Sequence, residues 1–255
     1  MSIWAAIAIF AAGIGAGTIN VIVGSGTLFT FPVLLAAGLT PVTANVSNTL
    51  GLVTGNLSGV IGYRRELRDQ RRRIIRFGTV ALIGGLTGAV LLTTLPPETF
   101  AAVVPVLIGL ALVLVVLQPR LARALARRRE RTGVAPQADG GVALLLGLLL
   151  ASVYGGYFGA AQGVMYLSLM GLLLADGMQR INALKNVLAV VVNGVAALFF
   201  LFAAHPDWRA VLLIAAGSTL GGQIGAKVAR RLPPTAMRAV IVLVGVVAMA
   251  ELLLR

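Results

Sequence analysis

Apolar segments about as long as a bilayer is thick follow one another along almost the whole chain. Of its 255 residues, 58% are apolar and 11% are charged, and the mean hydropathy is +0.97. Soluble domains carry roughly 25% charged residues, so a soluble fold of this composition could not cover its surface. One transmembrane helix needs about 20 apolar residues, and runs of that length recur here. The sequence therefore predicts an all-α integral membrane protein.

The positive charge is sorted into a few short loops. The net charge is +13. Most basic residues lie in three loops, residues 63–76, 119–140 and 227–234. Three turns hold no Lys or Arg: residues 39–41, 96–98 and 204–208. Because cytoplasmic loops are enriched in Lys and Arg, we expect a multi-pass protein of the bacterial plasma membrane, with basic loops cytoplasmic and both termini outside. This layout argues against nucleic acid as a partner, and membrane lipids are the expected surroundings.

The chain divides into two similar halves, residues 1–118 and 141–255, joined by the basic linker 119–140. Each half is predicted to hold a helical hairpin that a glycine-rich break interrupts, followed by three transmembrane helices. The second limbs of the hairpins, residues 27–38 and 164–175, are about half a bilayer long. The sequence leaves open whether they span or re-enter. The loop charges give the halves opposite orientations, which predicts inverted repeats.

The glycine-rich breaks are candidate ligand sites. Gly24-Ser25-Gly26 interrupts the first half, and residues 159–163 interrupt the second. Glycine lets a ligand approach the backbone closely, and freed N–H groups at a helix start favour an anion. Tight helix packing is the alternative role for such glycines. A weak internal alignment pairs Gly26 with Gly163, and Asn48 with Asn186.

Lys185 is the most distinctive single residue, because a charge within a membrane helix costs roughly 2.5–3.5 kcal/mol. An anionic substrate is one partner for it, and Asp176 is the nearest acid in sequence. Alternatively, its ammonium reaches the cytoplasmic interface. Asparagines on both sides of the repeat, such as Asn45 and Asn182, either bind substrate oxygens or join helices.

Two stretches resemble the sulfite exporter TauE/SafE family, also called TSUP. Residues 24–34 are similar to its glycine-rich motif ending in Pro-x-Leu, and residues 182–186 followed by Asn193 are similar to its Lys-Asn helix opening. Ser25 replaces the usual glycine of the first motif, and Leu169 stands where the second copy would carry proline. The resemblance implies export or uptake of small anions such as sulfite, sulfoacetate or related organosulfur compounds.

We therefore expect a secondary transporter that exports small anions by alternating access. An anion channel and an uptake permease for another anion are the alternatives. The predicted substrate-binding residues are Gly24, Ser25, Gly26, Thr27, Asn45, Asn48, Gln162, Gly163, Asn182, Lys185, Asn186 and Asn193. No cofactor is expected; Na⁺ or H⁺ as a coupling ion and a homodimer stay open.

Enzyme chemistry finds little support in the sequence. It has no cysteine and a single histidine, which excludes a Cys nucleophile and a histidine-based metal set. No two acids share a predicted span. We therefore expect no catalytic residues and no metal site.

Overall fold

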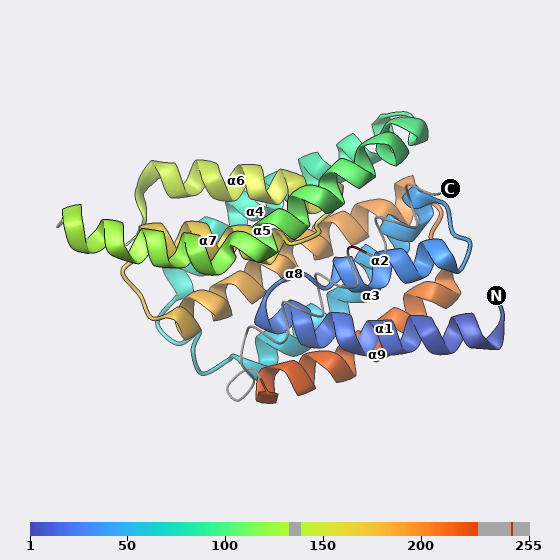
Figure 1. The fold of residues 1–255 in the computed structure, drawn as a ribbon, viewed down its shortest axis with the longest axis horizontal. Coiled ribbons are helices and arrows are strands. Elements are labelled where there is room, and N and C mark those ends of the chain that lie inside the picture. The colour runs from blue at the N-terminus through green and yellow to red at the C-terminus, as the bar shows by residue number, and fades with distance from the viewer. Residues whose placement is uncertain (133–138, 229–245, 247–255) are drawn as a thin grey trace.

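The computed structural model describes residues 1–132, 139–228 and 246. Within them the chain is helical and no strand occurs (Figure 1). The helices are α1 (Ile3–Ile22), α2 (Thr27–Ala36), α3 (Pro41–Gly62), α4 (Arg71–Thr94), α5 (Pro97–Thr132), α6 (Gly141–Tyr157), α7 (Gln162–Leu173), α8 (Met178–Ala203) and α9 (Trp208–Val228). The prediction of an all-α protein is confirmed.

Four segments of the described chain are long and apolar enough to cross a membrane: α1, α4, Pro97–Leu117 of α5, and α8. Helix α3 is long but polar, with buried side chains such as Asn48, Asn56 and Ser58. It packs against α1, α2, α5, α8 and α9, so it lies inside the bundle. Large apolar side chains such as Val106 and Leu212 are exposed, as suits a surface facing lipid.

The first helix of each predicted half packs against the other half. Helix α1 packs on α9, and α6 packs on α4; likewise α3 packs on α9, and α8 on α4. Glycines line these seams. A Cβ on Gly17 would lie 2.2 Å from the carbonyl oxygen of Ser218, and one on Gly88 would lie 2.0 Å from that of Val153. Such close backbone contact is the usual way in which helices pack in a membrane.

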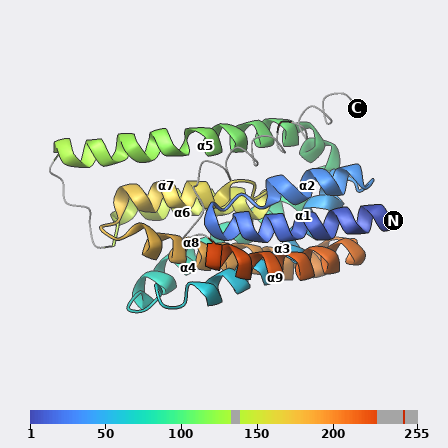
Figure 2. The same cartoon turned by 60° about the horizontal axis from the view of Figure 1, so that its bottom comes forward.

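Each hairpin bends back at its break. Helix α2 packs on α1, and α7 on α6 (Figure 2). Helices α2 and α7 have 10 and 12 residues, so at 1.5 Å per residue neither crosses a bilayer alone. The breaks lie in the middle of the bundle, and α2 and α7 start there.

One boundary differs from the prediction. We expected the first half to end at residue 118, but α5 continues to Thr132. The predicted linker 119–140 is therefore helical over its first part. The expected last span, residues 236–254, lies outside the described residues except for Val246.

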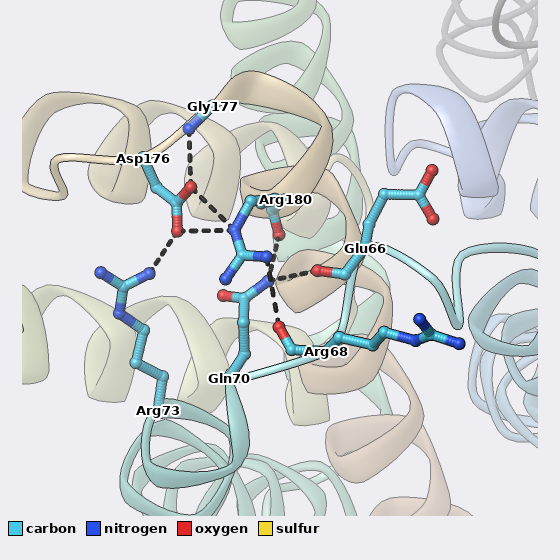
Figure 3. A network of polar contacts seen from close by, with 7 residues as sticks. All are labelled: Glu66, Arg68, Gln70, Arg73, Asp176, Gly177 and Arg180. Carbon is cyan, nitrogen blue, oxygen red and sulfur yellow. Dashed lines mark hydrogen bonds and ion pairs between the residues drawn. The ribbon is translucent and has the colours of Figure 1, made fainter.

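Basic segments predicted to share one side lie together at one end of the bundle. The loop before α4 and the turn before α8 are joined by Arg73 and Arg180, which both bind Asp176 (Figure 3). The end of the linker joins them, because Arg72 and Arg76 pair with Asp139 at 3.6 and 3.9 Å. The side of the membrane that this end faces stays a prediction.

Candidate functional site

The two breaks touch each other through their glycines. The Gly163 amide donates to the Gly24 carbonyl oxygen at 3.1 Å. A Cβ on Gly24 would lie 2.3 Å from the Cα of Gly163, and one on Gly163 would lie 2.4 Å from the Cα of Gly24. Gly24 also has a φ of 84°, a conformation that other residues rarely adopt. Both positions therefore require glycine.

Lys185 closes the carboxyl end of α1. Its Nζ donates to the carbonyl oxygens of Asn20 at 2.7 Å and Val21 at 3.0 Å, and its side chain is fully buried. Asn182 and Asn186 donate to the same Val21 oxygen at 3.3 and 3.4 Å. The last carbonyls of a helix lack partners within it and carry partial negative charge, so a cation is favoured there.

The interfacial alternative for Lys185 is wrong, because its ammonium points into the bundle and no part of it is exposed. Asp176 is not its partner either. This carboxylate binds Arg73 and Arg180 instead, together with the Gly177 amide (Figure 3). Burial favours the neutral acid, but these hydrogen bonds outweigh it and hold the pKa of Asp176 below its ordinary value.

The carboxyl end of α6 is closed by an amide instead of an ammonium. Asn45 Nδ2 donates to the carbonyl oxygen of Tyr157 at 2.8 Å. Asn45 on α3 thus binds a carbonyl in the last turn of α6, and Asn182 on α8 binds a carbonyl in the last turn of α1. Both are fifth in their helices, counted from Pro41 and Met178.

Counting from the helix starts gives a second register for the repeat, beside the one predicted from residue types. Counted in this way, Asn48 and Lys185 are both eighth in their helices, one residue from the predicted partner Asn186. At the breaks, Gly24 and Gly159 share a positive φ, of 84° and 77°, whereas the predicted alignment matches Gly26 with Gly163.

The first break is surrounded by a polar cluster. The Gly26 amide donates to Asn20 Oδ1 at 3.2 Å, and Asn20 in turn donates to Asn56. Asn48 donates to Thr27 Oγ1 at 3.2 Å. These contacts fix the start of α2 against α1 and α3.

Ser25 lies within the first break and is completely buried. Its hydroxyl has no hydrogen-bond partner among the described residues. Buried polar groups are nearly always paired, so this hydroxyl is free to bind a ligand.

The second break has a smaller polar cluster. Gln162 Nε2 donates to the Tyr166 hydroxyl at 2.7 Å, and Tyr166 lies 2.6 Å from the hydroxyl of Ser152. Asn193 lies two turns beyond Lys185 on α8, and its side chain is half-buried.

The structure thus places the predicted residues other than Asn193 within the two breaks or in contact with the segments that flank them. Sequence reasoning missed three polar residues, Asn20, Asn56 and Ser152. A signal was present for Asn20, a lone amide in the last turn of an apolar helix just before the break. Within the described chain, no group of three His, Cys, Asp or Glu residues could hold a metal ion.

The apolar helices and the buried polar groups at paired helix breaks define an integral membrane protein of the transporter class. Residues 9–252 match the family model described as Sulfite exporter TauE/SafE. The chain belongs to this family.

Curated relatives cover nearly all of the chain. It is 27% identical over 242 residues to "Probable membrane transporter protein YfcA" of Escherichia coli K12, which covers 93% of this chain and 86% of that protein. A "Probable membrane transporter protein" of Haemophilus influenzae is 26% identical, covering 96% and 92%. "Probable membrane transporter protein ORF9" of a Sinorhizobium species is 26% identical, covering 96% and 91%. No solved structure matches the chain.

Proposed function

We propose that the protein is a secondary transporter that exports small anions such as sulfite or sulfoacetate across the bacterial plasma membrane by alternating access. The observation that carries this proposal is the meeting of two helix breaks beside a fully buried Lys185. All hydrogen bonds of that ammonium within the described chain go to carbonyl oxygens. No acid of the described residues pairs with it, so its positive charge favours a nearby anion.

The helix starts supply positive electrostatic potential for the anion. Helices α2 and α7 begin at the breaks, with Thr27 and Gln162 as first residues. The first amides of a helix have no partner within it, and the helix dipole is positive there. In this structure the Gln162 amide donates to Gly159 and the Gly163 amide to Gly24, so the support for an anion is the positive end of each helix dipole together with the unpartnered hydroxyl of Ser25.

The packing of the two halves against each other suits a movement of one part of the bundle relative to the other. The contacts α1–α9 and α4–α6 repeat one arrangement in both halves, which supports an inverted repeat. Carriers built in this way rock one part against the other around a central site. We propose that the ionic cluster of Arg73, Asp176 and Arg180 helps to close the cytoplasmic end.

The test measures flux through purified protein in liposomes with labelled sulfite, sulfoacetate, taurine and sulfate. A carrier saturates with substrate and exchanges labelled for unlabelled anion across the membrane. We expect Lys185→Ala to abolish the exchange and Gly194→Ala to preserve it, because a Cβ on Gly194 meets no atom within 4 Å. Flux without saturation or exchange would indicate the alternative, an anion channel. Full exchange by Lys185→Ala would contradict the proposed site.

The direction of transport needs a separate measurement. We expect cells producing the protein to release preloaded labelled sulfite faster than cells producing Lys185→Ala. Accumulation from the medium without release would identify an uptake permease instead.

A further inference from the structure

The carboxyl ends of α1 and α6 have the same backbone closure. In α1 the Gly24 amide donates to the Ile19 carbonyl at 3.2 Å, and in α6 the Gly159 amide donates to the Tyr154 carbonyl at 3.1 Å. Counting back four residues from each glycine, Asn20 corresponds to Gly155. The carbonyl oxygens of Asn20 and Val21 at the end of α1 therefore correspond to those of Gly155 and Gly156 at the end of α6.

Only one of the two ends receives a positive charge. At α1, the oxygens of Asn20 and Val21 accept from the Lys185 ammonium. At α6, the equivalent oxygens belong to Gly155 and Gly156, and no hydrogen bond from a described residue reaches them. The residue in the register of Lys185 is Asn48, whose amide is turned to Thr27.

The buried side-chain oxygen of Asn45 also lies at the carboxyl end of α6. Asn45 is 1% exposed, and its Oδ1 has no partner among the described residues. Its Nδ2 donates to the Tyr157 oxygen at 2.8 Å, which places the amide group at the end of α6. Asn182 also has an unpartnered Oδ1, but there the Lys185 ammonium supplies the positive charge.

We propose that a monovalent cation, Na⁺, binds at the carboxyl end of α6 and takes the place that the Lys185 ammonium takes in the other half. Its ligands are Asn45 Oδ1 and the carbonyl oxygens of Gly155 and Gly156. This deepens the proposed transport function, on which it rests, by naming the coupling ion.

The chemistry of the site selects this kind of ligand. All three ligand groups are neutral oxygens at the negative end of a helix dipole, so they attract a cation and repel an anion. Half-helix carboxyl ends and unwound carbonyls are the groups that bind Na⁺ in broken-helix carriers. With Na⁺ bound, both broken helices carry one positive charge, and the two charges flank the breaks where the anion is expected.

The experiment compares NaCl with choline chloride, using purified protein for thermal unfolding and liposomes for sulfite exchange. A ligand that binds the folded state raises the unfolding temperature by mass action. We expect Na⁺ to raise this temperature and to accelerate net sulfite flux at least tenfold over choline. Asn45→Ala should raise the half-saturating Na⁺ concentration at least tenfold.

Two further variants distinguish a loss of Na⁺ binding from a general destabilisation of the fold. Asn182→Ala removes the matching amide in the other half and should keep the Na⁺-dependent rise in unfolding temperature. Asn48→Lys places a lysine in the register of Lys185, and we expect its folded state to become insensitive to Na⁺.

Each outcome has one meaning. Saturable wild-type transport with the same rate and unfolding temperature in choline would overturn the cation site alone. An undiminished Na⁺ response in Asn45→Ala would overturn it as well. A Na⁺-dependent rise in unfolding temperature without transport of any anion tested would support the cation site and contradict the proposed anion transport.

Discussion

The carboxyl ends of α1 and α6 share a backbone and differ in charge. Both end in a glycine with positive φ, and both are held by an asparagine from the opposite half. The α1 end adds the Lys185 ammonium, whereas the α6 end has Asn48 in that register. The comparison shows that backbone geometry can be kept in two halves of a chain while the charged group is placed in only one.

The α1–α9 and α4–α6 contacts show the opposite behaviour, because glycines allow close backbone contact in both. Gly17 meets Ser218 on α9, and Gly88 meets Val153 on α6. Packing is thus similar in the two halves, which differ in the polar and charged side chains at their breaks.

The largest effect should follow from Gly24→Ala. A Cβ there collides with Gly163 and forces alanine into a left-handed conformation, which costs about 1–2 kcal/mol before any overpacking of about 1–3 kcal/mol. We expect a loss of folded protein, measured by size-exclusion chromatography and thermal unfolding. Gly194→Ala is the matched control. Wild-type stability of Gly24→Ala would mean that the breaks do not touch.

Lys185→Met tests the charge at the α1 end. It keeps the apolar stem and removes the donor to the Asn20 carbonyl, and an unpaired buried acceptor costs about 1–3 kcal/mol. We expect a lower unfolding temperature. Val21 keeps Asn182 and Asn186, which limits the loss. A more stable Lys185→Met protein would show that burying the ammonium costs more than its hydrogen bonds return.

Gly17→Ala and Gly88→Ala test the similarity of the seams. Each places a methyl group against a carbonyl oxygen of the facing helix, so we expect similar losses of about 1–3 kcal/mol. Thermal unfolding of both variants measures the difference. A large loss in only one of them would show that the seams are not equivalent.

The smallest effect is the pH response of Asp176. Its pKa in the folded protein is lowered from an ordinary value of 3.8. Its stabilisation is therefore complete well above pH 3.8 and is lost as the pH falls through the lowered pKa. Because Arg180 is partly exposed, we expect less than about 1 kcal/mol. Unfolding temperatures of wild type and Asp176→Asn should converge as the pH falls below 3.8; a constant difference would contradict this.

Local patterns were enough to predict the breaks, the short arms and the helices around them. The glycines and the run of apolar residues up to position 23 mark where α1 ends, because helix termination is a local property. The partners of Lys185 were not predictable in this way. They are carbonyls more than 160 positions away along the chain, and a carbonyl is carried by every residue.

The register of the repeat stays a prediction. Matching residue types favours Asn48 with Asn186, whereas counting from the helix starts places Asn48 in the register of Lys185. The continuation of α5 to Thr132 was missed because arginine does not end a helix.

The first helix of each half packs against a helix of the other half, and this has a consequence for membrane insertion and folding. Helix α1 is synthesised first, yet its main partner α9 follows only after most of the chain. Until α9 is inserted, the side of α1 that carries Gly13 and Gly17 therefore lacks its packing partner. Separated fragments cut at the linker should assemble only when both are produced in the same membrane.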